Sequence, residues 1–230
     1  MSIFSPLSVQ TETLPSCQEH AAKGRIFLLS PADLSGVRAS LLLRKQASFE
    51  LAARLRESAA PLGEVFSFIS GLYFRGKLAY ARAFAEPTAI LVITTSRGFL
   101  TPETPLGLED LKNMARVPVS ASDARYRAPL ERDAMHLAER IGTKCEVVLL
   151  GSIATPKYVE PLLAILGDRL MFPSEFVGRG DMSRGGLMLR AVRECSQLAY
   201  TPIIGSLRHG ARPPRLAGIP CVATQRGKRA

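Results

Sequence analysis

The sequence lacks any apolar stretch long enough to cross a bilayer. A spanning helix needs roughly 18 to 20 apolar residues without charge. The longest apolar runs of the chain, such as 89–93 and 147–150, have the length of a β-strand. Residues 1–24 also lack the basic start and the continuous apolar segment of a secretory signal, and they are rich in Ser, Thr, Pro and Gln. We therefore expect no membrane partner and a poorly ordered leader over residues 1–24.

Paired metal-ligating or catalytic residues are also missing. The cysteines, Cys17, Cys145, Cys195 and Cys221, are far apart and form no CxxC pair, so their spacing indicates neither a zinc site nor a disulfide framework. The histidines, His20, His136 and His209, have no evident metal or triad partner, and a GxSxG motif is absent. We therefore predict no metal, no cofactor and a cytoplasmic location.

Acidic residues are scarce relative to basic ones. The chain has 30 Lys and Arg against 20 Asp and Glu, which gives a formal net charge of +10. Beyond Gly205 there is no acid, and the basic residues there are Arg208, Arg212, Arg215, Arg226, Lys228 and Arg229. A tail over 205–230 with this charge would attract nucleic acid or another polyanion in a salt-sensitive way. The alternative is a tail that only increases solubility.

Strand and helix patterns alternate along residues 25–204. Short apolar runs predict strands at 25–29, 89–95, 145–150, 169–172 and 198–203, and 63–73 is interpreted as a buried strand or loop. Apolar residues at helical spacing predict helices at 36–59, 77–84, 126–141, 157–166 and 187–193. The apolar strands do not alternate with polar residues, which is typical of a sheet covered on both faces. The sequence thus predicts a three-layer α/β domain with a partly parallel central sheet.

Three of the predicted strands end in loops rich in hydroxyl groups and glycine, at 30–36, 94–98 and 151–157. The carboxyl ends of parallel strands are where open α/β sheets bind ligands, and a helix N-terminus offers free N–H groups to an anion. The candidate ligand-binding residues in these loops are Ser30, Ser96, Arg97, Ser152 and Lys157. The alternative is that Ser35, Ser152 and Thr155 only cap helices.

The glycine-rich segment 178–186 precedes an apolar helical stretch. Its glycines permit tight backbone turns, and Arg179 and Arg184 carry guanidinium groups suited to phosphate or carboxylate, with Ser183 adding a hydroxyl. The segment has no Gly-Lys-Ser/Thr ending and does not follow the first strand, so it is neither a Walker loop nor a dinucleotide fingerprint. We interpret it as an anion cradle at a helix start. The alternative is a surface loop in which Asp181 neutralises an arginine.

Aromatic and basic residues are interleaved over Tyr73–Tyr80, where Arg75 and Lys77 become further candidate ligand-binding residues. The alternative assigns the aromatic rings to the core and the cations to its solvated edge. Acids within reach of the same rim are Asp33, Glu64, Glu103, Asp123, Glu175 and Asp181. The pair that flanks the glycine-rich segment, Glu175 and Asp181, is our first choice for acid–base catalysis.

Two short segments resemble a known family. Leu28-Leu-Ser-Pro-Ala32 resembles the opening of the YaaA-like peroxide-stress proteins, and Ser70-Gly-Leu-Tyr73 is similar to another segment of that family, although Phe-Arg-Gly follows here where the family usually continues with Gly-Leu. Thr94 to Pro102 is similar to an α/β domain of archaeosine synthases. The resemblance covers about a quarter of the chain. It implies an α/β fold, a link to DNA or modified nucleobases, and a role in stress response.

These observations together predict a protein that binds a nucleotide or nucleic acid through phosphate contacts at the strand-end loops and at 178–186, and that acts as a nucleotide- or nucleobase-directed transferase or hydrolase if it is an enzyme. The competing hypothesis is an enzyme that acts on a small phosphorylated metabolite, with the tail unimportant. A partner-binding protein without catalysis is the third hypothesis. The sequence does not indicate the oligomeric state or the choice between DNA and RNA.

Overall fold

A six-stranded mixed sheet forms the centre of the computed structural model, which describes residues 24–214 and 216. The strands are arranged in the order β4-β3-β1-β6-β7-β8. The four inner strands are parallel: β1 (Arg25–Leu29), β3 (Ile90–Ile93), β6 (Glu146–Leu150) and β7 (Leu170–Pro173). The edge strands β4 (Phe99–Leu100) and β8 (Tyr200–Pro202) are antiparallel to their neighbours. The predicted leader up to residue 23 and the tail at 215 and 217–230 lie outside the described residues.

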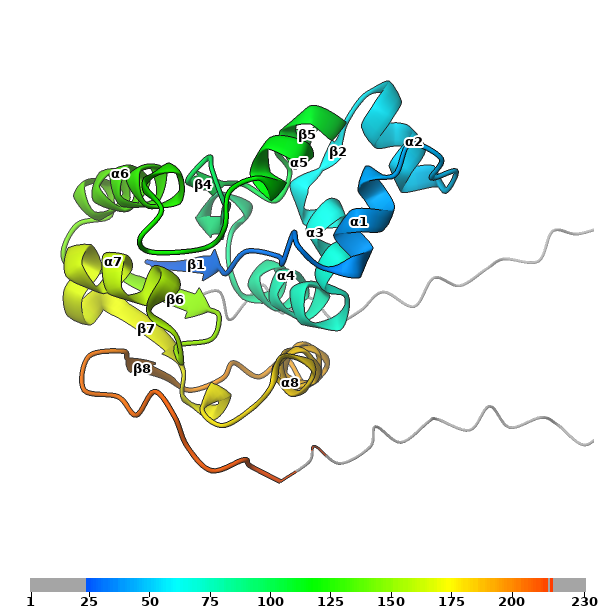
Figure 1. The fold of residues 1–230 in the computed structure, drawn as a ribbon. Coiled ribbons are helices and arrows are strands. Elements are labelled where there is room, and N and C mark those ends of the chain that lie inside the picture. Colours follow the sequence, from blue (N-terminus) through cyan, green and yellow to red (C-terminus); the bar gives the residue numbers. More distant parts are fainter. Residues whose placement is uncertain (1–23, 215, 217–230) are drawn as a thin grey trace, which may run out of the picture.

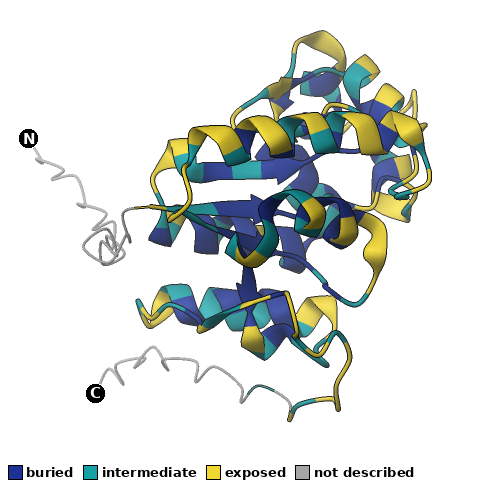
Figure 2. Cartoon of the chain, turned by 90° about the vertical axis from the view of Figure 1, so that its left-hand side faces the viewer, coloured by how far each residue is buried: buried dark blue, intermediate teal, exposed yellow. Residues whose placement is uncertain are grey.

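Helices cover both faces of this sheet. Helices α4 (Leu72–Phe84) and α8 (Asp181–Arg193) pack together on one face, and α6 (Ala124–Arg140) and α7 (Pro156–Leu166) pack together on the other (Figure 1). Phe27, Leu28 and Leu29 of β1 are fully buried, and Figure 2 shows the strands in dark blue between helices with exposed outer faces. Burial on both faces explains the continuous apolar runs. The predicted three-layer α/β fold with a partly parallel sheet is confirmed.

Four further helices gather beyond the carboxyl end of β1 (Figure 1). They are α1 (Val37–Leu43), α2 (Glu50–Glu57), α3 (Leu62–Ser70) and α5 (Leu108–Ala115). A small antiparallel pair, β2 (Ala60–Pro61) and β5 (Pro105–Leu106), joins them. Short 3₁₀ turns η2 (Pro87–Ala89), η3 (Gly167–Arg169) and η4 (Ser174–Phe176) lie next to the strands. We call the four helices the cap, because they cover the end of the sheet where the parallel strands finish.

The single helix predicted over 36–59 is wrong, because the structure has two helices there. Helix α1 ends at Leu43, Arg44 has an extended backbone, and α2 begins at Glu50. Residues 44–49 contain neither glycine nor proline, so the sequence carries no local breaking signal. The ring of Phe49 stacks on Phe68 of α3, with the ring centroids 5.2 Å apart. This contact is made with a distant part of the chain, so helical spacing alone does not show it.

The strand or loop predicted over 63–73 is also wrong. Residues Leu62–Ser70 form α3, and α4 begins at Leu72. Val65, Phe66 and Ile69 are buried on one side of α3, which is the spacing of an amphipathic helix. A short segment rich in Val, Phe and Ile is ambiguous between helix and strand.

Helices α4 and α8 cross at two glycines. A Cβ atom added to Gly76 would lie 2.7 Å from the Gly185 carbonyl oxygen, and one added to Gly185 would lie 2.7 Å from the Leu72 carbonyl oxygen. The backbones are therefore in direct contact at this crossing. The predicted loop over 178–186 is corrected accordingly: α8 begins at Asp181 with Gly180 as its N-cap, and Gly185 serves helix packing instead of ligand approach.

Asp133 of α6 fastens the edge strand β4 to the helix layer. Its Oδ2 atom accepts a hydrogen bond of 2.8 Å from the Phe99 amide nitrogen. We expect Asp133→Ala to lower the free energy of unfolding by about 1 to 3 kcal/mol, because it leaves a partly buried N–H without its acceptor. Asp133→Asn keeps an acceptor oxygen and should cost less. Urea denaturation of both variants checks this, and equal losses would contradict the assignment to the hydrogen bond.

Candidate functional site

A cleft opens between the cap and the carboxyl ends of the parallel strands. The chain leaves β1 towards β3 and leaves β6 towards β7, which lies on the other side, so the loops after these two neighbouring strands diverge. Such a divergence is where open α/β sheets bind ligands. The cleft has a volume of about 960 Å³. Its lining comprises residues 30–38 and 115–119 together with Ile69, Ser70, Tyr73, Thr95, Ser152, Thr155, Lys157, Tyr158, Asp181 and Met182.

Ser30 and Lys77 form a buried polar pair at the base of this cleft. Ser30 is the first residue after β1 and lines the cleft, and Lys77 of α4 is fully buried. The Lys77 Nζ atom lies 2.9 Å from the Ser30 Oγ atom and 2.6 Å from the Ser30 carbonyl oxygen. Burial lowers the pKa of the Lys77 ammonium to about 7, because an apolar environment disfavours the charged form.

Two tyrosines stand beside this pair. The Tyr158 hydroxyl donates a hydrogen bond of 2.8 Å to the Ser152 carbonyl oxygen, which holds α7 against the loop after β6. Gly151 in the same loop allows the Ser30 side chain to lie against the backbone, because a Cβ atom at residue 151 would lie 2.8 Å from the Ser30 Cβ atom. The buried Tyr73 hydroxyl lies close to Arg184, but it has no hydrogen-bond partner of normal geometry among the described residues. A buried polar group without a partner is a candidate for ligand contact.

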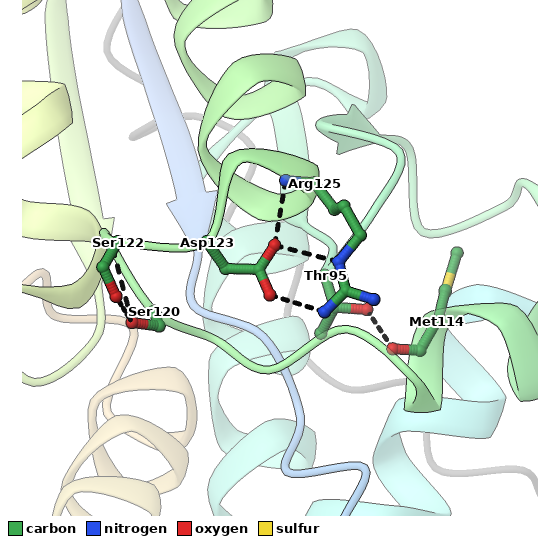
Figure 3. A network of polar contacts seen from close by, with 6 residues as sticks. All are labelled: Thr95, Met114, Ser120, Ser122, Asp123 and Arg125. Carbon is green, nitrogen blue, oxygen red and sulfur yellow. Dashed lines mark hydrogen bonds and ion pairs between the residues drawn. The ribbon is translucent and has the colours of Figure 1, made fainter.

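Thr95 fixes the wall of the cleft that residues 115–119 form. Its buried hydroxyl donates a 2.6 Å hydrogen bond to the Met114 carbonyl oxygen at the end of α5 (Figure 3). Farther along the same segment, Asp123 caps α6 by accepting a 2.9 Å hydrogen bond from the Arg125 amide nitrogen. Hydrogen bonds at both ends of the segment therefore position the wall, and the Thr95 hydroxyl is engaged within the protein.

Cations outnumber acids around the cleft. Arg38, Arg116 and Lys157 are exposed residues of its lining, and none of them forms a salt bridge with the described residues. The acids in the lining are Asp33 and Asp181. Hydrogen bonds from the Ser35 hydroxyl and amide lower the pKa of Asp33, which therefore stays ionised. The three cations and two acids together give the cleft lining a net charge of +1.

The start of α8 uses its arginines within the protein. The Arg184 Nε atom donates to the Phe176 carbonyl oxygen at 3.2 Å, and its guanidinium pairs with Asp181 at 3.2 Å. Arg179 donates to the Glu175 carbonyl oxygen at 3.0 Å and to the Ser183 hydroxyl at 3.2 Å. Arg179 and Ser183 line a smaller cavity of about 320 Å³ with residues 212–214. The predicted anion cradle is thus divided: Asp181 lines the cleft, Arg179 and Ser183 line the smaller cavity, and Met182 lines both.

The structure brings some of the predicted site residues together and separates others. Ser30, Ser152, Lys157 and Asp181 line the cleft, and Lys77 lies directly beneath it. Arg97 pairs with Asp110 of α5 at 3.3 Å. The predicted residues Ser96, Arg97, Arg75 and Glu175 are not part of the cleft lining. Glu175 and Asp181 consequently do not share this site: Glu175 lies in η4, and Asp181 is the first residue of α8.

Several lining residues were not predicted from the sequence, namely Arg38, Tyr73, Arg116 and Tyr158. Arg38 and Arg116 carry no motif and reach the cleft only because the cap folds over the strand ends. Tyr158 has a signal in the sequence, because it directly follows the predicted loop 151–157 at the start of a helix. Tyr73 belongs to the aromatic and basic segment Tyr73–Tyr80, where the sequence draws attention to the rings and cations and not to the phenolic hydroxyl.

The cysteines differ from the expectation in one respect. Cys145 is a free, partly buried thiol, and burial raises its pKa. Cys195 is disulfide-bonded, so the expected absence of disulfides is wrong at this residue. The cytoplasmic location, which rested on cysteine spacing, stays a prediction.

The described part of the chain contains neither a cluster of metal ligands nor a helix that could span a membrane. Within residues 24–214 and 216 no three His, Cys, Asp or Glu side chains gather closely enough to hold a metal ion. None of the helices in that part combines the length and the apolarity that a bilayer span requires.

No protein-family model, curated protein or solved structure matches the chain. The resemblance to YaaA-like proteins and to the archaeosine-synthase domain therefore stays a prediction, and the site has to be interpreted from its own chemistry.

Proposed function

We propose that the cleft binds the phosphate group of a nucleotide or of a nucleic-acid strand. The observation that carries the proposal is the convergence of Arg38, Arg116 and Lys157 on one cleft, where none of them pairs with an acid among the described residues. Cations without a carboxylate partner are available for charge-assisted hydrogen bonds to phosphate. A volume of about 960 Å³ lies within the range of small-molecule sites, about 300 to 1,000 Å³.

The position of the cleft supports the same proposal. It lies at the carboxyl ends of β1 and β6, between the hydroxyl-bearing loops that follow the two strands. Ser152 and Thr155 contribute hydroxyl groups near Lys157, and α7 begins at Pro156, directly after Thr155. A helix start adds the positive end of its dipole to these side chains. A role in nucleobase modification or stress response remains a proposal that rests on the resemblance alone.

A second candidate function is an enzyme that acts on a small phosphorylated metabolite. The Ser30 and Lys77 pair favours it, because a buried lysine hydrogen-bonded to a serine is a reactive arrangement. The two candidates share the phosphate contacts and differ in the ligand: a polynucleotide must extend out of the cleft, whereas a metabolite is enclosed by it.

We expect the double variant Arg116→Ala/Lys157→Ala to weaken binding of ATP and of a labelled single-stranded oligonucleotide at least tenfold, since each lost charge-assisted contact is worth about 1.5 to 3 kcal/mol. Titration calorimetry measures the ATP affinity and fluorescence anisotropy the oligonucleotide affinity. The control is Lys144→Ala/Arg193→Ala, which removes the same charge at exposed residues outside the cleft lining and should change binding less than about twofold by the salt-screened field alone.

The ligands separate the two candidates. If the cleft variant loses both ATP binding and oligonucleotide binding, the nucleic-acid proposal is supported. If pyrophosphate competes with ATP but not with the oligonucleotide, the metabolite enzyme is supported. Absence of binding to the wild-type protein, or equal binding by the two double variants, would refute the proposed site. Oligonucleotide binding that persists in the cleft variant and disappears on removal of residues 217–230 would assign it to the basic tail and also refute the cleft.

A further inference from the structure

The Lys77 amine is enclosed by two oxygen atoms and two aromatic rings. The Nζ atom donates to the Ser30 carbonyl oxygen at 2.6 Å and to the Ser30 hydroxyl oxygen at 2.9 Å. The rings of Tyr73 and Phe74, at 4.5 and 4.8 Å from Nζ to the centroid, add cation–π contacts to the ammonium form. In the neutral form, which burial favours, the lone pair of the same nitrogen can accept the Ser30 hydroxyl proton.

The charged groups near Lys77 oppose one another. Asp181 at the start of α8 favours the ammonium, and Arg184 one turn later opposes it. Two further titratable groups face the site, Tyr73 of α4 itself and Tyr158 of α7. Burial raises the pKa of both phenols, so both stay neutral. Desolvation is therefore the largest influence on the protonation of Lys77.

The serine of this pair faces the cleft, whereas the lysine does not. Ser30 is 4% exposed and belongs to the lining, while Lys77 is completely buried behind it. Ser30 therefore lies between the cleft and the amine, and the Tyr158 hydroxyl is a further neighbour of its side chain. Tyr73 also lines the cleft, and its buried hydroxyl has no hydrogen-bond partner of normal geometry among the described residues. A serine activated by an adjacent base is the arrangement of covalent catalysis, and serine–lysine variants of it exist.

We propose that Ser30 is a catalytic nucleophile and Lys77 its general base, and that the cleft hydrolyses an acyl ester whose remaining part carries an anionic group. The Ser30 Oγ atom attacks the acyl carbon, and its proton passes to the Lys77 nitrogen as the Oγ–C bond forms. The ester C–O bond breaks, and the leaving oxygen takes that proton from Lys77. Water then adds to the acyl carbon and gives one proton to Lys77. The Oγ–C bond breaks, the carboxylic acid leaves, and Lys77 returns the proton to the Ser30 Oγ atom.

The anionic part of this substrate rests on the proposed function, but the nucleophile does not. Arg38, Arg116 and Lys157 would hold the anion at the exposed side of the cleft, whereas the reaction takes place at its base. A fluorophosphonate probe, which carries no anionic recognition group, therefore tests the nucleophile separately. In the labelling reaction the Oγ–P bond forms, the P–F bond breaks, Lys77 accepts the proton and fluoride leaves.

The experiment treats the full-length protein with an alkyl fluorophosphonate and locates the adduct by peptide mass spectrometry. We expect the label on Ser30, no label in Ser30→Ala, and a rate at least tenfold lower in Lys77→Met, since a general base contributes about 10²- to 10⁴-fold. Ser67→Ala and Arg75→Met, which change residues outside the cleft lining, should label like the wild type. The wild-type rate should rise about tenfold per pH unit below pH 7 and level off above it, following the neutral fraction of Lys77.

Each outcome of the labelling experiment supports or overturns one part of the proposal. Absence of label on Ser30 while ATP still binds overturns the nucleophile and leaves the proposed function intact. Label on Ser30 with an unchanged rate in Lys77→Met overturns the role of the lysine. If Lys77→Met does not fold, as judged by circular dichroism, the pH profile of the wild type decides, and a rate that does not change around pH 7 refutes the general base.

Discussion

Replacing Gly185 by alanine is expected to lower the free energy of unfolding by about 2 to 4 kcal/mol, because the added methyl group has no room at a crossing of two backbones. The new Cβ atom would lie 2.7 Å from the Leu72 carbonyl oxygen and 3.0 Å from the Tyr73 Cα atom. These are main-chain atoms, which cannot rotate away as a side chain can. The helices must separate instead, and they lose contact along their length.

The neighbouring residue provides a matched control. Gly186 lies in the same helix, and a Cβ atom there would meet only the Leu216 side chain at 3.5 Å, an ordinary van der Waals distance. Gly186→Ala should therefore be neutral or stabilise the protein by up to about 1 kcal/mol through helix propensity. Urea denaturation of the two variants side by side measures the difference. Equal stabilities would show that the helices are not held at this distance.

The same crossing has a consequence for the cleft. It places Lys77, one residue after Gly76, against the turn of α8 that carries Asp181 and Arg184. A Gly185→Ala variant that still folds should therefore label more slowly at Ser30 with the fluorophosphonate probe. Gly185 thus acts through helix packing, whereas the sequence motif predicts ligand binding for the segment 178–186.

The sequence predicted the sheet well because buried parallel strands have an unusual composition. β1 was predicted with its bounds, and β6 and β3 were predicted to within one or two residues, since each is a continuous apolar run between turns. A strand that is buried on both faces has an apolar composition, and this composition is visible in the sequence of the segment itself. Helix ends were harder: α1 ends at Leu43 without a glycine or proline after it, and the stacking of Phe49 on Phe68 is a contact that no local pattern encodes.

The site was predicted in part for a similar reason. Ser30, Ser152 and Lys157 follow strand ends, so topology alone brings them to one edge. Arg116 lies far from any strand end in sequence and reaches the cleft through the cap. Lys77 is predicted from the sequence as a ligand-binding residue, with a place at the solvated edge of the core as the alternative, whereas the structure buries it completely. Exposure depends on how α4 packs against α8, which a single sequence does not show.

The stability of the wild type should rise relative to that of Lys77→Met as the pH increases from 7 to 9.5. An unfolded lysine has a pKa of about 10.4, whereas burial lowers the pKa of Lys77 in the folded protein to about 7. Between these values the unfolded chain holds a proton that the folded protein lacks. Raising the pH therefore removes an advantage of the unfolded state, and the folded protein becomes more stable.

The expected size of this effect is about 3 kcal/mol over the interval, since each pH unit in which one state is protonated and the other is not contributes about 1.4 kcal/mol. Below pH 7 both states are protonated, and the difference between the two variants should no longer change. Tyrosine and cysteine titrations, including that of Cys145, occur in both proteins and cancel in the comparison. Urea denaturation at several pH values measures the difference directly.

Arg75→Met is the control for this series, because Arg75 is an exposed residue of the same helix. Its stability should follow that of the wild type at every pH. Parallel curves for the wild type and Lys77→Met would mean that the buried amine stays protonated, and an ammonium cannot accept the Ser30 proton. The pH dependence of folding thus tests, without any substrate, the protonation state on which the reactivity of the cleft depends.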